Sequence, residues 1–197
     1  MTEEQILENI DELEPVESLG REESRQALYA MLFASDKPMS CGRLAEALGE
    51  DADHDVVKNM LAELEQEIEE KQLPYVLREI AGGYQLTTRP QFAPFIRRLF
   101  QIKKSKSLSR AALETLAIVA YKQPVTRGDV EAIRGVSVSH AFEILQEKRL
   151  IKVAGVAETP GRPKIYRTTD DFLIHFGIKS LKELPSIEEL REMDFGA

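Results

Sequence analysis

The residue types that commonly perform catalysis are few in this chain and widely separated. The three histidines, His54, His140 and His175, do not have the spacing of metal ligands. The single cysteine, Cys41, excludes an internal disulfide and a thiolate metal cluster. No serine lies in a nucleophile-elbow sequence. We therefore predict no catalytic residue, no metal site and no cofactor, and hence a protein that is not an enzyme.

Two short motifs could bind phosphate or a metal ion, but each has a simpler structural interpretation. The glycine pair Gly82–Gly83 lies between two β-rich runs, which predicts a hairpin turn rather than a phosphate-binding loop. The acid pair Asp170–Asp171 falls at a predicted helix start, where carboxylates interact favourably with the helix dipole. Neither motif indicates a reaction.

Basic side chains are the remaining chemical signal. Residues 103–169 contain thirteen bases and six acids, a net charge of +7, whereas the whole chain carries a net charge of -8. Dedicated nucleic-acid binders present a broad cationic surface. Because the chain as a whole is acidic, we predict that its direct DNA binding is weak or absent. Four bases lie in the predicted C-terminal hairpin, where they could contact phosphate or an acidic protein segment: Lys152, Arg162, Lys164 and Arg167.

The elements that position these side chains begin with three predicted helices and a hairpin. Apolar periodicity predicts helices at residues 22–34, 40–48 and 53–72, with Ser40 as the cap and Gly49 as the stop of the second. Two β-rich runs at residues 75–80 and 84–88 predict a hairpin. The third helix is expected to bury one side, formed by Val56, Val57, Met60, Leu61, Leu64 and Ile68.

The same order of elements recurs 86 residues further along the chain. The turn proline Pro38 aligns with Pro124, and the helix-ending Gly49 aligns with Gly135. Thr126-x-x-Asp129 resembles a capping box at the start of the second helix. A third helix is predicted at residues 137–148, with Phe142 and Leu145 facing the core, and strands are predicted at 151–156 and 164–168. Three helices followed by a two-stranded wing form the winged-helix pattern.

We predict a mainly α protein with small β wings, built from two tandem winged-helix domains. The predicted parts are an acidic N-terminal tail at 1–21, a first, dimerising winged-helix domain at 22–101, a basic linker at 102–108, a second winged-helix domain at 109–177 and an acidic C-terminal tail at 178–197. Residues 2–14 could form a partner-docking helix or belong to a mobile tail. No apolar run approaches the ~18–20 residues of a membrane helix, and the N-terminus lacks signal-peptide features, so we expect a cytoplasmic protein.

A run of large apolar residues follows the first hairpin. Residues 90–100 are predicted to form a helix in which Phe92, Phe95, Ile96, Leu99 and Phe100 share one face. This stripe either packs against the first module or forms a dimer surface, because so much apolar area on one helix requires a partner.

The third helices argue against DNA reading. A winged helix that reads bases uses side chains such as Arg, Lys, Asn and Gln on this helix. The first module carries many acids there, including Glu63 and Glu65, and the second carries Glu143 and Glu147. A winged-helix transcription regulator that binds DNA is nevertheless the alternative interpretation.

Several motifs of the second module together resemble a known family. They are Leu108–Arg127 (LSRAALETLAIVAYKQPVTR), Ile133–Val136 (IRGV), Leu145–Ile151, Pro160–Pro163 (PGRP), Tyr166–Thr169 (YRTT), Phe172-Leu173 and Phe176–Pro185. These motifs resemble segregation and condensation protein B (ScpB), over about residues 24–186. The opening of the third helix, often Asn-Ser-Asp in the family, is Ser137-Val138-Ser139 here.

The resemblance implies a function without catalysis. Members form homodimers chiefly through the N-terminal domain and bind the kleisin ScpA, which bridges the heads of the SMC ATPase during chromosome condensation and segregation. A nucleoid-associated protein in the cytoplasm is thus expected, with no membrane partner or small-molecule substrate. We assign the dimer interface to Phe92, Phe95, Ile96 and Leu99, and partner binding to Arg162, Lys164, Phe172 and Phe176.

Overall fold

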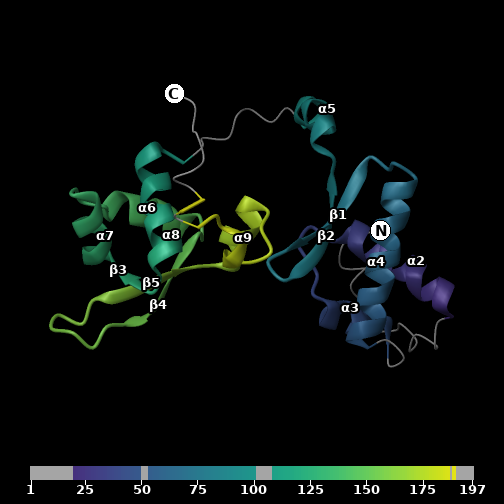
Figure 1. Ribbon diagram of the computed structural model, residues 1–197, viewed down its shortest axis with the longest axis horizontal. Helices are drawn as coiled ribbons and strands as arrows, with labels where there is room; N and C mark the ends of the chain where they lie inside the picture. Colours follow the sequence, from purple (N-terminus) through teal and green to yellow (C-terminus); the bar gives the residue numbers. More distant parts are fainter. Residues whose placement is uncertain (1–19, 50–52, 101–107, 187, 190–197) are drawn as a thin grey trace, which may run out of the picture. The chain divides into compact units, whose positions relative to one another are not determined.

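The computed structural model describes residues 20–49, 53–100, 108–186 and 188–189. The chain divides into two compact units, Met1–Glu79 with Gly83–Phe92, and Ile80–Gly82 with Ala93–Ala197. The segment 2–14 and the predicted linker up to residue 107 lie outside the described residues. The elements in Figure 1 are α2 (Arg21–Ala34), α3 (Cys41–Leu48), α4 (His54–Glu70), β1 (Tyr75–Ile80), β2 (Gly83–Thr88), η1 (Pro90–Phe92), α5 (Ala93–Leu99), α6 (Arg110–Lys122), β3 (Val125–Thr126), α7 (Arg127–Arg134), α8 (Ser139–Glu147), β4 (Ile151–Val156), β5 (Lys164–Thr168), α9 (Asp170–Phe176) and η2 (Leu181–Glu183).

The helices α3 and α4 begin where side chains satisfy their first free N–H groups. The Ser40 hydroxyl accepts a 3.3 Å hydrogen bond from the Arg43 backbone N–H, which starts α3. The Asp53 carboxylate accepts one of 2.8 Å from Val56 N–H, which starts α4. α3 ends at Gly49, whose φ of 102° favours glycine. The cap and the stop predicted for this helix are confirmed.

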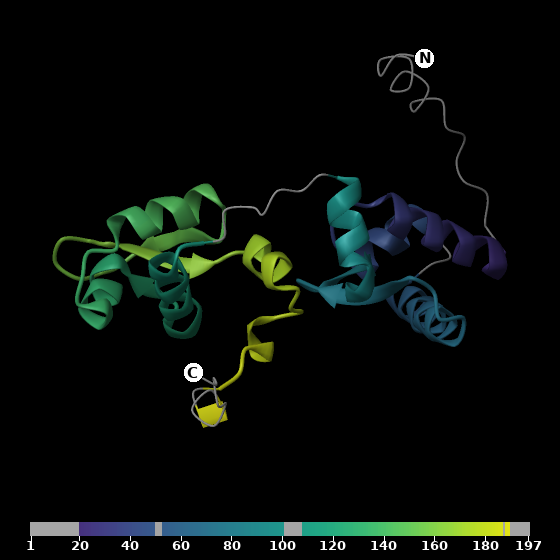
Figure 2. The same cartoon turned by 90° about the horizontal axis from the view of Figure 1, so that it is seen from above.

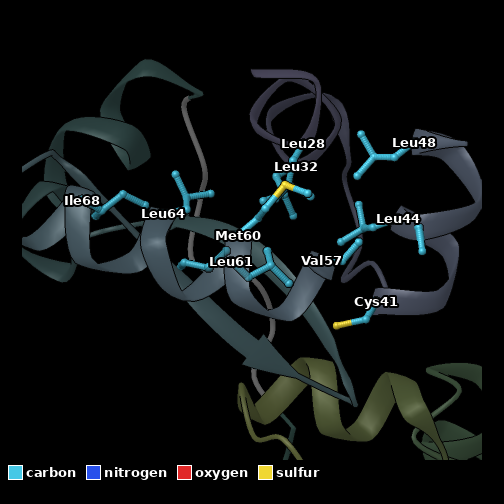
Figure 3. Packing of buried hydrophobic residues seen from close by; sticks show 12 residues of the cluster. Leu28, Leu32, Cys41, Leu44, Leu48, Val57, Met60, Leu61, Leu64 and Ile68 are labelled. Atoms are coloured by element: carbon cyan, nitrogen blue, oxygen red, sulfur yellow. The ribbon is translucent and has the colours of Figure 1, made fainter. Parts of the chain in front are cut away.

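The core of the first unit lies between α2, α3 and α4 (Figure 3). Cys41 is buried there, and its burial raises the pKa of the thiol. Val56 is exposed, contrary to prediction, because it precedes the buried Val57 by one residue and points about 100° away around the helix. The buried apolar side chains on the three helices include Leu28, Leu32, Leu44, Val57, Leu61, Leu64 and Ile68.

β1 and β2 form the predicted two-stranded wing of the first unit. The segment before α3 joins this wing, because Met39 and Tyr84 exchange two backbone hydrogen bonds of 2.9 and 2.8 Å. Gly83 permits the close approach, since a Cβ at this position would lie 3.0 Å from backbone atoms of Pro38 and Met39. The wing is therefore attached to the start of α3 as well as to its own hairpin.

The second unit contains the helices α6, α7, α8 and α9 and a three-stranded sheet of order β3-β5-β4. The β4–β5 hairpin projects beyond the helices of this unit (Figures 1 and 2). Phe142 and Leu145 are buried as predicted, and the ring of Phe142 meets that of Tyr166 edge-on, with centroids 4.7 Å apart. α8 begins at Ser139, two residues later than predicted.

The capping box predicted at the start of α7 is confirmed. Thr126 Oγ1 accepts a 3.2 Å hydrogen bond from Asp129 N–H, and an Asp129 carboxylate oxygen accepts one of 2.9 Å from Thr126 N–H. The Thr126 hydroxyl also donates a 2.7 Å hydrogen bond to this carboxylate, and this bond together with the one from the Thr126 N–H lowers the pKa of Asp129. Short local contacts of this kind fix where α7 begins.

The two units repeat the same arrangement. α3 and α7 have equal lengths and start 86 residues apart, and each ends at a glycine, Gly49 or Gly135. Val125 pairs with Tyr166 in the second unit as Met39 pairs with Tyr84 in the first. The third helix differs, with 17 residues in α4 and 9 in α8. The fold is mainly helical with small β wings, and it contains two winged-helix folds in tandem.

Candidate partner-binding surfaces

An apolar groove opens on the first unit between the end of α2 and the wing. Its volume is about 490 Å³. Pockets of about 300–1,000 Å³ with mostly apolar linings are typical binding sites, so the groove is large enough for several side chains. We call it the α2–wing groove, and its lining includes Tyr29, Ala30, Phe33, Tyr75, Leu86 and Thr88.

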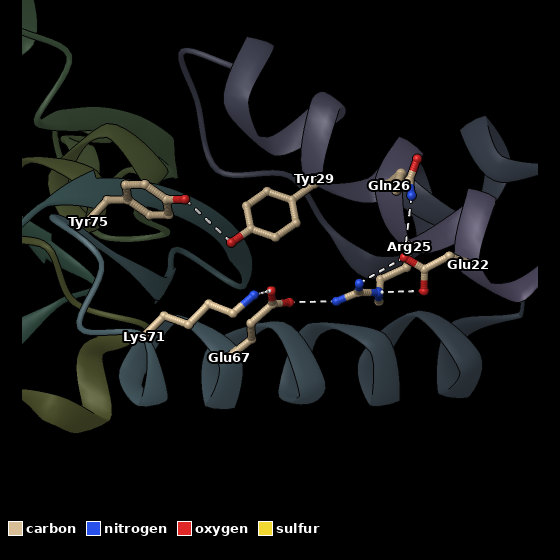
Figure 4. Close-up of polar contacts among 7 residues, drawn as sticks. All are labelled: Glu22, Arg25, Gln26, Tyr29, Glu67, Lys71 and Tyr75. Atoms are coloured by element: carbon tan, nitrogen blue, oxygen red, sulfur yellow. Dashed lines mark hydrogen bonds and ion pairs between the residues drawn. The ribbon is translucent and has the colours of Figure 1, made fainter.

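Polar contacts hold the two walls of this groove in place (Figure 4). The hydroxyl oxygens of Tyr29 and Tyr75 are 3.5 Å apart. Burial is the larger cause that raises the pKa of Tyr29, and this contact raises it further. Arg25, on the same helix as Tyr29, donates a 2.5 Å hydrogen bond to Glu67 of α4. Lys71 pairs with the same carboxylate. The hydrogen bonds from these two cations lower the pKa of Glu67, and the one from Lys71 has the larger effect. α2 is thus tied to both β1 and α4.

Phe33 stands at the edge of the α2–wing groove with 85% of its surface exposed. The helical periodicity of α2 did not indicate Phe33, because the apolar stripe of this helix is centred on Leu28 and Leu32. A large aromatic residue beside such a stripe, rather than within it, is the sequence signal that could have found it. The ring adds exposed apolar surface to the groove, as expected of a protein-binding surface.

α5 carries a second exposed apolar surface. Its side chains Phe95 and Leu99, together with Phe100 just beyond its end, are 67%, 72% and 67% exposed. Both interpretations of this stripe, packing against the first module and a dimer surface, stay predictions. The predicted single helix from residue 90 is also interrupted, because η1 precedes α5.

The proposed dimer residues are differently exposed on this segment. Phe92 of η1 and Ile96 of α5 are half-buried, whereas Phe95 and Leu99 are largely exposed. The structure places all four on consecutive turns of η1 and α5. Their assignment to a dimer interface stays a prediction.

The two phenylalanines of α9 that we assigned to partner binding differ in their burial. Phe172 is only 3% exposed and belongs to the core of the second unit, so its assignment to a partner-binding surface is corrected. It is buried because α9 turns its first apolar residue onto the helices of its own unit. Phe176, one turn later, is 45% exposed, and the two ring centroids are 4.8 Å apart. Only Phe176 is available on the surface.

The predicted basic wing lies on the exposed β4–β5 hairpin. Lys152 and Arg167 are directly opposite each other on β4 and β5, so their side chains share one face. That face is hollowed, with a volume of about 680 Å³ lined partly by these two residues. Arg162 and Lys164 are exposed at the tip and at the start of β5. The hairpin is thus a compact cationic surface.

The third helix of the second unit presents acids where a DNA reader carries cations or amides. Glu143 and Glu147 are exposed on α8, and His140 lies 3.8 Å from the Glu143 carboxylate. Carboxylates repel DNA phosphates, so the exposed side of α8 is unfavourable for entry into a groove of DNA. Four cations of this unit lie on the wing instead: Lys152, Arg162, Lys164 and Arg167.

The described ranges contain neither a cluster of metal-ligand side chains nor a membrane-spanning helix. No group of three or more His, Cys, Asp or Glu side chains in residues 20–49, 53–100, 108–186 and 188–189 could hold a metal ion. In the same residues, no helix has both the length and the apolar character needed to cross a membrane.

Residues 26–187 match the family described as Segregation and condensation complex subunit ScpB. The chain belongs to this family. The match begins in α2 and ends after η2, so it includes both winged-helix units of this ScpB-family chain.

Relatives with the same family name cover most of the chain. Segregation and condensation protein B of Symbiobacterium thermophilum is 46% identical over 164 residues, which are 83% of this chain and 74% of that protein. Segregation and condensation protein B of Clostridium tetani is 46% identical over 165 residues, 84% of this chain and 86% of that protein.

Solved structures of ScpB proteins are also similar in sequence. The crystal structure of ScpB from Mycobacterium tuberculosis is 33% identical and covers 82% of this chain and 99% of that chain, with a TM-score of 0.40. A crystal structure of a dimer of the ScpB N-terminal domain complexed with a ScpA peptide is 26% identical and covers 39% of this chain and 93% of that chain, with a TM-score of 0.35.

Proposed function

We propose that this chain is a non-enzymatic scaffold subunit of a segregation and condensation complex. In this role it forms a homodimer, binds the kleisin ScpA and is connected through ScpA to the heads of the SMC ATPase. Membership of the ScpB family supports a role in segregation and condensation. ScpA is the partner that the sequence resemblance implies, and nucleoid association would follow from membership of the complex.

The observation that carries this proposal is the apolar surface that the chain exposes on two elements. Phe33 on α2 and the Phe95–Phe100 end of α5 are exposed although side chains of this kind are usually buried in a folded protein. Contiguous exposed apolar patches mark protein–protein contact sites. Two such surfaces suit a scaffold that contacts a second copy of itself and a further chain.

Partner binding is proposed for the second unit at Phe176 and the cationic wing tip, Arg162 and Lys164. An extended kleisin segment could fold onto such a surface, with its apolar side chains on Phe176 and its acidic side chains near the wing. Phe172 is excluded from this surface by its burial.

Co-purification tests the partner. We expect affinity-tagged chain, co-expressed with ScpA, to retain ScpA in a stoichiometric complex through size-exclusion chromatography. The double variant R162A/K164A should weaken this capture, whereas K148A, which removes an exposed cation after α8, should not. Failure of the unaltered chain to retain ScpA would contradict the proposal.

Sedimentation equilibrium tests the dimer. The wild-type chain should sediment with twice the mass of one chain, which is 22.3 kDa. A single monomeric species at micromolar concentration contradicts the homodimer.

The cationic wing supports a second candidate function, DNA binding by a transcription regulator. Lys152 and Arg167 share one face of the hairpin and could contact phosphates. Titration of duplex DNA at increasing salt separates the two functions, because phosphate contacts make the affinity fall steeply with salt. Tight, sequence-selective binding at physiological salt would favour the regulator, and weak binding that is indifferent to sequence favours the scaffold.

A further inference from the structure

We propose that one face of the β4–β5 hairpin binds the phosphates of duplex DNA, through Lys152 and Arg167, without reading the base sequence. This contact goes beyond the proposed scaffold function, in which the chain is linked to the nucleoid only through the SMC complex. It also assigns different cations of one hairpin to different partners, because Arg162 and Lys164 are proposed for ScpA.

The register of the sheet separates the side chains of the hairpin into two faces. Tyr166 is buried in the core of the unit and is opposite Val153, so these two residues mark the inner face. Lys152 and Arg167 are each one residue away and directly opposite each other, so they share the outer face, where both are exposed. Lys164 is two residues from Tyr166 and therefore belongs to the inner face. The two pairs of cations are thus separate.

Lys152 and Arg167 are like charges held side by side without a neutralising acid. Directly opposite residues have Cβ atoms about 4.5–5.5 Å apart, and like charges at such positions destabilise a sheet. No acidic side chain among the described residues forms an ion pair with either one. In the same unit, by contrast, Arg110 and Arg134 both pair with Glu114. An anion bound on the outer face therefore relieves a repulsion that the fold leaves in place.

The outer face is open and hollowed, so it is accessible to a large ligand. Its hollow has a volume of about 680 Å³ and is lined by both cations together with Pro124, Ile165 and residues of β4. The hairpin projects beyond the helices of its unit (Figures 1 and 2). Duplex DNA can therefore approach the two cations along the hairpin.

The local charge of the hairpin, rather than the net charge of the chain, governs this contact. Residues 151–168 contain four basic side chains and one acid, Glu158, a net charge of +3, although the whole chain carries -8. At physiological ionic strength, exposed charges more than about 8 Å apart are largely screened from each other. Acids elsewhere in the chain therefore weaken the attraction of phosphates to this face but do not abolish it.

DNA phosphates suit the outer face better than an acidic peptide does. A peptide that folds onto a surface needs large apolar anchors, and Phe176, an exposed phenylalanine of this unit, lies on α9 and not on the hairpin. The guanidinium of an arginine binds phosphate through two parallel hydrogen bonds, and a lysine binds it as a point charge. An Arg–Lys pair with few apolar neighbours is thus a phosphate-binding arrangement.

The contact carries no base specificity, because the helix that would read bases is kept away from DNA. Glu143 and Glu147 are exposed on α8, and carboxylates repel phosphates. Contacts to phosphate fix the position of a protein on DNA but do not distinguish one sequence from another. We therefore expect weak binding that is the same for unrelated duplexes.

The salt dependence of DNA binding tests this contact. Fluorescence anisotropy of the full chain with two labelled duplexes of unrelated sequence gives the slope of log K against log salt concentration. Each phosphate contact contributes about 0.9 to the magnitude of this slope, so K152Q/R167Q should lower the magnitude by about 1.8. The charge-conserving variant K152R/R167K should keep the wild-type slope.

Matched variants separate the outer face from other causes. R97Q/R98Q removes the same charge from exposed positions of α5 and should leave the slope unchanged. R162A/K164A, which alters the cations proposed for ScpA, should lower the slope less than K152Q/R167Q does. The melting temperature of K152Q/R167Q, followed by circular dichroism, should be no lower than that of wild type, because the repulsion across the strands is removed.

Several results would overturn the inference. They are no DNA binding by wild type at low salt, equal slopes for wild type and K152Q/R167Q, and an equal loss in R97Q/R98Q, which would trace the effect to net charge. Sequence-selective binding would replace it with the regulator. Loss of ScpA capture in K152Q/R167Q with an unchanged DNA slope would assign the outer face to ScpA.

The scaffold function is tested independently of this contact. K152Q/R167Q should retain ScpA through co-purification while its DNA slope falls, which supports both the scaffold and the DNA contact. A wild-type chain that fails to retain ScpA, but whose DNA slope depends on Lys152 and Arg167, contradicts the scaffold function and leaves the DNA contact standing.

Discussion

The guanidinium of Arg134 donates a 2.8 Å hydrogen bond to the hydroxyl of Thr115, whose side chain is fully buried in α6. The same group donates to the Ala111 carbonyl at 2.8 Å and pairs with Glu114 at 2.9 Å. Arg134 thus joins the end of α7 to the first half of α6.

We expect R134A to lower the free energy of unfolding by about 1–3 kcal/mol, because it leaves a buried hydroxyl without one of its partners. R110A, which removes an arginine that is almost fully exposed on α6, should change it by less than about 0.5 kcal/mol. Urea denaturation followed by circular dichroism measures both. Equal stability of R134A and wild type would show that this network contributes nothing.

Phe172 and Phe176 provide a matched pair on α9. F172A should destabilise the second unit by about 3–5 kcal/mol, because it opens a cavity in the core. F176A should cost less than about 1 kcal/mol, because much of its ring already contacts water. Thermal unfolding compares the two variants, and similar losses in both would contradict the burial assigned to Phe172.

Gly83 is required for the contact between the wing and the segment before α3. G83A should cost about 1–3 kcal/mol, since its Cβ meets backbone atoms of Pro38 and Met39 at 3.0 Å and the backbone must shift. G155A on β4 is the control, because its Cβ has no neighbour within 4 Å. Faster amide hydrogen exchange at Met39 and Tyr84 in G83A would locate the damage, and protection equal to wild type would argue against it.

The contacts of Glu67 predict a pH dependence of stability. Lys71 and then Arg25 lower the pKa of this carboxyl below its ordinary value of 4.5, so its ionised form stabilises the folded state. This contribution is fully present above the ordinary pKa and is lost as the pH falls through the lowered pKa. E67Q should therefore be less stable than wild type at neutral pH, and the difference should shrink in acid.

Urea midpoints of wild type and E67Q across the acidic range measure this effect. E65Q, at an exposed position of the same helix, is the control and should follow wild type more closely. A difference between E67Q and wild type that stays constant from neutral pH to strong acid would rule out an electrostatic origin.

The elements of both units could be predicted from the sequence because their signals are local. Ser40, Asp53 and Thr126 accept hydrogen bonds from N–H groups three residues away, so cap and helix are encoded within one turn. The inward positions of Phe142 and Leu145 follow from helical periodicity in the same way. The winged-helix order and the 86-residue repeat are sums of such signals.

The candidate surfaces could be predicted only in part. The apolar stripe of Phe92–Phe100 and the basic hairpin are visible as patterns in the sequence. The hairpin and three residues of the stripe, Phe95, Leu99 and Phe100, are exposed in the structure. The α2–wing groove was not predicted, because it joins α2 to β2 across more than fifty residues of chain. Local periodicity carries no information about contacts over that separation.

By itself, the sequence determined the order of helices and wings, the caps and glycine stops, the repeat and the family. Tertiary structure alone decided which apolar residues are covered. Phe172 and Phe95 both lie on a short helix after a wing, yet only Phe172 is buried. Burial depends on which distant segment covers a side chain, and that is settled only when the elements pack together.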